Sequence, residues 1–248
     1  MQILQDKALV IPVAHPKQIT SVIPKSKELK GDEVIVHWGI DEVHTLRSVG
    51  IKAPSPISRR YKWTGQYTPF DHQKKTAAFL TLNKRAFCFN EQGTGKTASA
   101  IWAADYLISQ GKVNRVLVIC PLSIMDSAWR NDMFSFAMHR RVDVAYGSKS
   151  KRKAVIEGDA EFVVINYAGV ELVEDAIASG GFDLIIVDEA THYKNAQTKR
   201  WKALNRLLQT DTWLWLMTGT PAAQSPTDAF GLAKLVNPLG VPRFFGAF

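Results

Sequence analysis

One stretch of the sequence restricts the fold of this chain more than any other: residues 90–97, which read Asn-Glu-Gln-Gly-Thr-Gly-Lys-Thr. It follows a short apolar run at 85–89, which we expect to form a buried strand. It precedes residues 98–110, whose apolar positions have helical spacing. A strand, a glycine-rich loop and a helix, in that order, form the context of a phosphate-binding loop. The glycines let several backbone N–H groups point at one anion, and the helix N-terminus adds its positive dipole end.

The side chains of this loop predict a nucleotide site. Lys96 can reach the β- and γ-phosphates, and the Thr97 hydroxyl can ligate magnesium. We expect the loop residues before them to complete the cradle: Gln92, Gly93, Thr94 and Gly95. The strict pattern places glycine where this chain has Asn90, and the alternative interpretation is a glycine turn that caps an ordinary helix. The agreement with strand–loop–helix context favours nucleotide binding.

Length and composition restrict the class of protein. A chain of 248 residues can bury one substantial α/β domain and a smaller appendage, and 46% apolar residues fit a globular protein. No run approaches the roughly 18 apolar residues of a membrane span, and the N-terminus lacks the layout of a signal peptide. Cys88 and Cys120 are the only cysteines, and both read as small buried hydrophobes. We therefore expect a cytoplasmic protein that does not contact a membrane.

The charge balance favours a polyanionic partner. Lysine and arginine number 31 against 23 acidic residues, a net charge of +8. The basic residues cluster at 59–63, 139–141, 149–153 and 199–202. Each cluster alone is typical of a solvated face, but together they make nucleic acid the leading partner.

Residues 1–60 differ in texture from the rest of the chain. Segments 8–13, 18–23 and 33–38 are short and β-branched and are predicted to be strands, while 41–49 suits a short helix. The proline-rich residues 53–56 are typical of a linker. We predict a small β-rich N-terminal module, and its sequence indicates no role.

From residue 67 onward the pattern alternates between helices and strands. Residues 71–83 are predicted to be a helix capped by Asp71, and 124–138 and 198–209 are also expected to be helical. Six strands are predicted, at 85–90, 115–120, 142–146, 161–166, 182–188 and 212–218. Their nearly continuous apolar character is typical of a mostly parallel sheet covered by helices on both faces.

Polar residues follow the predicted strands at five places. They are residues 93–97, 121–123, 166–167, 188–189 and 218–221. Ligands of open α/β sheets bind at the carboxyl ends of the strands. These five segments are therefore expected to converge on one rim of the sheet.

Two adjacent carboxylates end the apolar strand at 182–188. Asp188 can hold a magnesium ion, and Glu189 can orient and deprotonate an attacking water. The alternative is a solvated acidic turn after a strand. The phosphate-binding loop upstream favours catalysis.

Gln73 precedes the first predicted strand of the sheet. Its amide offers one donor and one acceptor, which match the edge of adenine, and Tyr67 and Phe70 are candidates to pack on the base. An ordinary exposed helix glutamine is the alternative.

Taken together, the motifs resemble those of superfamily-2 helicases. The resemblance rests on Gly-Thr-Gly-Lys-Thr at 93–97, Asp-Glu-Ala-Thr at 188–191 and Thr-Gly-Thr-Pro at 218–221, in this order. The chain is most similar to the Swi/Snf-like ATPases, because Lys-Asn at 194–195 and Leu-Val-Asn-Pro at 235–238 also match their pattern. DEAD-box RNA helicases carry Ser-Ala-Thr at the third motif instead. The weaker resemblance of residues 1–60 is to the leading segment of phage-encoded members.

The resemblance implies a RecA-like P-loop NTPase lobe over 61–248 that binds ATP and Mg²⁺. It implies that Gln73 recognises adenine, that Lys96 and Glu189 are catalytic, and that Thr97 and Asp188 are the metal ligands. The motif that contains Pro121 and Ser123, with Trp129, lies along the nucleic-acid track in such proteins. The family resemblance assigns six residues to nucleic-acid contact or to coupling: Pro121, Ser123, Asn166, Thr218, Gly219 and Thr220. Thr191, where many relatives have histidine, and Asn90 depart from the pattern without removing a phosphate-binding group.

These enzymes use two RecA-like lobes, and the second supplies arginine fingers. Only ten residues follow Pro238, so we expect the second lobe to be absent from this chain and ATP turnover to be slow without it. The favoured function is the ATP-binding lobe of a DNA helicase or translocase that acts on double-stranded DNA. The alternatives are the motor part of a restriction or repair translocase, and a nucleotide-gated DNA-binding module that does not hydrolyse ATP.

Overall fold

The computed structural model describes residues 1–220, 226–242 and 245–247. The chain divides into two compact units, Met1–Lys62 and Trp63–Phe248. Each unit contains one β-sheet of its own.

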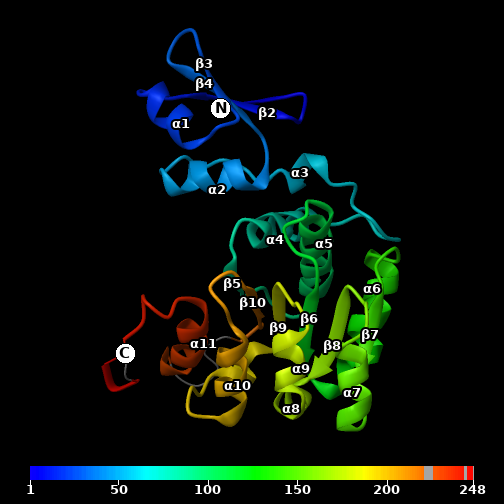
Figure 1. The fold of residues 1–248 in the computed structure, drawn as a ribbon. Coiled ribbons are helices and arrows are strands. Elements are labelled where there is room, and N and C mark those ends of the chain that lie inside the picture. The colour runs from blue at the N-terminus through cyan, green and yellow to red at the C-terminus, as the bar shows by residue number, and fades with distance from the viewer. Residues whose placement is uncertain (221–225, 243–244, 248) are drawn as a thin grey trace. The chain divides into compact units, whose positions relative to one another are not determined.

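The first unit contains a four-stranded antiparallel sheet with the strand order β1-β2-β4-β3 (Figure 1). Its strands are β1 (Gln2–Leu4), β2 (Ala8–Pro12), β3 (Ser26–Leu29) and β4 (Glu33–His37), and its helices are α1 (Pro16–Val22), α2 (Ile40–Ser48) and α3 (Ile57–Arg60). Leu9 pairs with Val36 and Ile11 pairs with Val34, and all four side chains are buried. Because side chains alternate along a strand, these residues share one face of the sheet, which forms the core of the unit.

Two predictions for this unit are wrong. Residues 18–23, predicted as a strand, lie largely in α1, where Ile19 is buried; Ile23, the residue after the helix, is also buried. The expected linker is packed into the unit: Ala53 is buried, and the carbonyl of Pro54 accepts a hydrogen bond from Trp38 Nε1 at 2.9 Å. Local composition predicted neither result, because tertiary burial decided both.

The second unit contains a six-stranded parallel sheet with the order β5-β10-β9-β6-β8-β7, which confirms the predicted α/β class. The strands are β5 (Arg85–Cys88), β6 (Val116–Cys120), β7 (Val142–Ala145), β8 (Phe162–Asn166), β9 (Leu184–Asp188) and β10 (Trp213–Met217). Each lies within a range predicted from the apolar runs.

Helices cover both faces of this sheet. They are α4 (Asp71–Thr81), α5 (Lys96–Ser109), α6 (Asn131–Phe136), α7 (Lys149–Ile156), α8 (Tyr167–Leu172), α9 (Glu174–Ser179), α10 (Lys199–Leu207) and α11 (Ala229–Val236). Helices α7 to α10 contact one another as one group, and α4, α5 and α6 form another (Figure 1). Successive strand residues such as Leu117 and Val118 are both fully buried, which requires a helical layer on each side.

Helix boundaries correct two further predictions. Asp71 is the first residue of α4 and does not cap it; the Phe70 N–H instead donates to Gln73 Oε1 at 2.9 Å. The single helix expected at 124–138 is three pieces: the 3₁₀ turn η1 (Leu122–Ile124), the π-helix η2 (Met125–Arg130) and α6. The other short turns are η3 (Ala190–Tyr193), η4 (Pro226–Asp228) and η5 (Phe245–Ala247).

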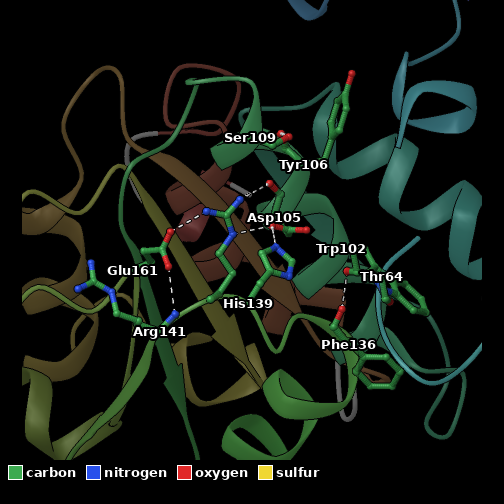
Figure 2. Close-up of polar contacts among 10 residues, drawn as sticks. Thr64, Trp102, Asp105, Tyr106, Ser109, Phe136, His139, Arg141 and Glu161 are labelled. Atoms are coloured by element: carbon green, nitrogen blue, oxygen red, sulfur yellow. Dashed lines mark hydrogen bonds and ion pairs between the residues drawn. The ribbon is translucent and has the colours of Figure 1, made fainter. Parts of the chain in front are cut away.

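Helix α5, which begins at Lys96, is anchored near its other end by a buried carboxylate. Asp105, 2% exposed, accepts hydrogen bonds from Arg140 Nε at 2.6 Å and His139 Nε2 at 2.9 Å (Figure 2). Arg140 also donates to Glu161 Oε1 at 2.6 Å. His139 and Arg140 precede β7, and Glu161 precedes β8, so the ion pairs tie the helix to the amino-terminal edge of the sheet.

Among the described residues, no helix is long and apolar enough to cross a membrane.

Candidate active site

The loop between β5 and α5 has the backbone of a phosphate cradle. Gly93 and Gly95 have φ of 77° and 75°, in the left-handed region that favours glycine. A Cβ atom at Gly95 would also lie 2.1 Å from Gln73 Nε2. The backbone conformation therefore favours glycine at both positions, and at Gly95 a side chain would also displace the Gln73 amide.

Lys96 lies on this loop. Its Nζ donates to the carbonyls of Asn90 and Glu91, both at 2.9 Å, so the ammonium lies against the chain that forms the cradle. Thr97 is the second residue of α5 and is partly exposed. The helix therefore presents a cation and a hydroxyl at its amino end, together with its dipole.

Gln73 contacts the loop from α4. Its Nε2 donates to the Thr94 carbonyl at 3.3 Å, while its Oε1 accepts from Phe70 N–H. His72 Nε2 lies 3.0 Å from the same carbonyl, and its ring stacks on Phe70 with the centroids 5.7 Å apart. His72 was not among the predicted site residues, although its position beside Gln73 in the sequence was an available signal. Tyr67 and Phe70 are exposed, at 62% and 67%, as a base-packing surface requires.

The two carboxylates lie where β9 ends. Asp188 Oδ2 accepts from Trp129 Nε1 at 3.0 Å, and Oδ1 accepts from the Glu189 N–H at 2.9 Å. Burial raises the pKa of Asp188; its two hydrogen bonds lower it, the charge of Glu189 raises it and the charge of Lys96 lowers it. The strand that leads into the phosphate loop, β5, and β9 both pair in parallel with β10, so the loop and this carboxylate follow strands that end at the same edge of the sheet.

Glu189 has a left-handed backbone, with φ 48° and ψ 58°. A residue with a side chain adopts this conformation at a cost of about 1–2 kcal/mol. Its Oε1 accepts hydrogen bonds from the hydroxyls of Thr191 at 3.0 Å and Thr218 at 2.9 Å. Tyr167 OH donates to the Asp188 carbonyl at 2.6 Å, which holds the main chain at this point. Strain supported by several contacts is typical of functional sites.

The segment after β10 joins the phosphate loop. The Thr218 N–H donates to the Cys88 carbonyl at 3.1 Å, and a Cβ atom at Gly219 would lie 3.2 Å from Gln92 Cγ. Thr220 N–H donates to Thr218 Oγ1 at 3.1 Å. The last residue of the predicted 218–221 motif, Pro221, lies outside the described residues. Through Thr218, this segment contacts both Glu189 and the strand that leads into the loop.

The remaining predicted residues lie at the ends of β6 and β8. Pro121 and Ser123 follow β6, and the Ser123 carbonyl accepts from Ser127 Oγ. Asn166 Oδ1 accepts from Nη1 of the buried Arg152 at 2.8 Å, so this amide oxygen holds a guanidinium inside the fold. Their contact with nucleic acid stays a prediction.

The donor set suits magnesium bound together with a nucleotide. Within the described part of the chain, no group of three or more His, Cys, Asp or Glu side chains could hold a metal alone. Mg²⁺ is usually held by one or two carboxylates together with substrate phosphates and water. Asp188, with one hydrogen-bond donor on each oxygen, and the Thr97 hydroxyl fit that requirement.

A third carboxylate near this site was not predicted. Burial, and then the charge of Asp188, raise the pKa of Asp132 to about 6. Asp132 is the second residue of α6, three positions after Trp129. Nothing in the local sequence indicates that this residue lies within electrostatic range of Asp188.

Comparison with known proteins identifies the same region. The family described as the SNF2-related domain matches residues 72–244. Putative protein p41 of Acyrthosiphon pisum secondary endosymbiont phage 1 is 28% identical over 69% of this chain and 39% of its own length. The uncharacterized ATP-dependent helicase YqhH of Bacillus subtilis is 27% identical over 69% of the chain and 30% of its own length.

Two further similarities agree. The SWI/SNF-related matrix-associated actin-dependent regulator of chromatin subfamily A-like protein 1 of Drosophila melanogaster is 25% identical over 71% of the chain and 22% of its own length. The Sulfolobus solfataricus SWI2/SNF2 ATPase core, solved in complex with dsDNA, superimposes with a TM-score of 0.63 at 24% identity, covering 71% of this chain and 37% of that one. This chain therefore spans well under half the length of the proteins it matches.

Proposed function

Because the chain belongs to the SNF2-related domain family, we propose that its second unit is the ATP-binding lobe of a DNA-dependent ATPase, a helicase or translocase. The proposal is carried by the parallel pairing of β5 and β9 with β10, because the loop that leads to Lys96 follows β5 and the carboxylates of Asp188 and Glu189 end β9 at the same edge of the sheet. A site that hydrolyses a nucleoside triphosphate needs a cation on the phosphates, a carboxylate that binds the metal and a general base, and these residues provide all three.

The residues divide the chemistry as follows. Lys96 neutralises the β- and γ-phosphates, the loop N–H groups hold the phosphate oxygens, and Gln73 and His72 lie toward the base. Thr97 and Asp188 are the ligands for Mg²⁺, which supplies charge neutralisation between the phosphates when bound. Glu189 accepts the proton of the attacking water, and its hydrogen bonds to two threonine hydroxyls fix its orientation.

The proposed partners are double-stranded DNA and a second RecA-like lobe, supplied by a longer chain or by another chain. An arginine finger from such a lobe is worth about 10³–10⁵ in rate, so slow turnover is expected of the 248 residues alone. The basic composition, and the similarity to a Sulfolobus solfataricus ATPase core solved in complex with dsDNA, support the choice of DNA. Two buried free cysteines and the phage relative support a reducing cytoplasm, that of a host cell if the protein is phage-encoded.

Nucleotide binding can be tested on this chain directly. ATP with excess Mg²⁺ at 100 times its dissociation constant should stabilise the parent by about 2.7 kcal/mol, seen as a higher Tm. Lys96→Ala should abolish this shift. Lys84→Ala is the matched control, because Lys84 is exposed and forms an ion pair with Asp211 at 3.2 Å. Equal shifts in the parent and Lys96→Ala would refute the assignment of the loop.

Hydrolysis needs a second measurement. With a second lobe and duplex DNA added, Glu189→Gln should lower ATP turnover by about 10²–10⁴ without loss of ATP binding. Unchanged turnover would retire Glu189 as the base, whereas no turnover by the parent would favour the alternative of a nucleotide-gated DNA-binding module. The hydrogen-bonded and strained setting of Glu189 supports hydrolysis, because a binding module has no need of it. Only fused or partner domains would distinguish a restriction or repair translocase from the favoured function.

A further inference from the structure

Trp129 is the donor that completes the surroundings of Asp188. Its side chain is fully buried, and its Nε1 lies 3.0 Å from Asp188 Oδ2. An indole N–H is a donor only and keeps its proton at any physiological pH. The contact therefore always presents a hydrogen-bond donor to this carboxylate oxygen.

The two donors to Asp188 come from different directions in the fold. The Glu189 N–H belongs to the same turn as Asp188, whereas the indole reaches across from the segment that follows β6. One donor on each oxygen prevents rotation of the carboxylate and leaves one lone pair of each oxygen for a metal ion. Groups that hydrogen-bond a metal-binding carboxylate without touching the metal orient that carboxylate.

The backbone around Trp129 is unusual. Residues 125–130 form a π-helix, in which the N–H of Asn131 donates to the Asp126 carbonyl five residues earlier. One π turn carries an extra residue relative to an α-helix, which changes the direction in which its side chains point, and such turns are frequent at functional sites. The π-helix follows directly on Pro121–Ile124 at the rim of the sheet.

We propose that Trp129 is a positioning residue that orients Asp188 for Mg²⁺ and so sets how strongly the metal supports nucleotide binding. The inference rests on the proposed function. Trp129 touches neither the nucleotide nor the metal in this proposal and acts only through the Asp188 carboxylate.

The test compares ATP affinity with excess Mg²⁺ and with EDTA, measured by titration calorimetry on this chain. The ratio of the two affinities is the contribution of the metal. In Trp129→Phe this ratio should fall by about 10–100-fold, while affinity in EDTA stays at the parent value. Trp215→Phe is the matched control, since Trp215 is equally buried but its Nε1 donates to the Asn83 carbonyl. The control should leave both affinities unchanged.

Each other outcome overturns a defined part of the reasoning. An unchanged ratio in Trp129→Phe, or an equal loss in EDTA, would show that the indole is only structural. ATP binding by the parent with no effect of Mg²⁺ would also refute the inference and leave the nucleotide site standing. No ATP binding by the parent in either condition would refute the proposed function and this inference together. Should Trp129→Phe fold poorly, benzothienylalanine at position 129 keeps the shape of the indole without its N–H and should give the same fall in the ratio.

Discussion

The left-handed backbone of Glu189 makes a prediction about stability that can be isolated from catalysis. Glu189→Ala and Glu189→Gly both remove the carboxylate and its hydrogen bonds to Thr191 and Thr218. The two variants differ only in a Cβ atom at a residue whose φ is 48°. Their difference in stability therefore measures the backbone strain held at residue 189, the proposed catalytic base.

The magnitude follows from two opposing effects. Alanine in the left-handed region costs about 1–2 kcal/mol, which glycine avoids. The glycine variant loses about 0.4–1 kcal/mol of stability relative to alanine, because glycine has more conformational entropy in the unfolded chain. The glycine variant should thus be more stable than the alanine variant by about 0.5–1 kcal/mol. Because 1 kcal/mol shifts the Tm of a domain of this size by about 2–4 °C, its Tm should be higher by about 1–4 °C. At an ordinary helical position the order would be the reverse.

Tryptophan fluorescence is a suitable probe for the melting experiment, because every tryptophan except Trp38 lies in the second unit. Glu189→Gln provides the control, since its amide oxygen can still accept from both threonine hydroxyls and its backbone keeps the strain. We expect its Tm to lie within about 2 °C of the parent. An alanine variant as stable as the glycine variant would refute the claim that strain is stored at Glu189.

Three further predictions concern Asp132, Gly95 and Asp105 of the second unit. The pKa of Asp132 is raised, so its charged form is disfavoured in the folded state, and the stability it contributes at low pH is lost as the pH rises from about 4 through about 6. Asp132→Asn should therefore raise the free energy of unfolding by about 1 kcal/mol at pH 8, after allowance for solvent screening, with little gain at pH 4, and an equal gain at both pH values in melting curves would contradict this reasoning. Gly95→Ala should weaken the ATP-induced Tm shift, because alanine at a φ of 75° strains the loop by about 1–2 kcal/mol and its methyl would displace the Gln73 amide, and a normal shift would show that the loop tolerates a side chain there. Asp105→Ala should lower the free energy of unfolding by about 3–5 kcal/mol in denaturant titrations, since it leaves the largely buried guanidinium of Arg140 without one of its partners. A loss below about 1 kcal/mol would show that the remaining partner, Glu161, suffices.

Much of the framework of the candidate site was predictable from local sequence. The apolar runs ending at Cys88, Cys120 and Asp188 predicted strands, because a strand buried on both faces must be apolar throughout. Parallel strands present their carboxyl ends at one edge, so the polar residues after them had to share a rim. The spacing of Gly93, Gly95 and Lys96 likewise predicts a phosphate loop from backbone geometry alone.

Other features depend on contacts between residues distant in the sequence. The strand predicted at 18–23 is a helix as far as Val22, because burial of Ile19 against the rest of the unit outweighed the β-branched composition. The hydrogen bond from Trp129 to Asp188 joins residues 59 positions apart and depends on a π-helix that no local pattern indicated.

The sequence by itself determined which groups stand at the ends of the strands, since that order is a property of neighbouring residues. Only the tertiary structure decided how those groups are oriented: the strain at Glu189 and the indole on Asp188 exist because distant segments pack against them. The physical reason is that hydrophobic periodicity specifies which face of an element is buried, whereas the direction of a buried polar side chain is set by the donor or acceptor that the rest of the fold brings to it.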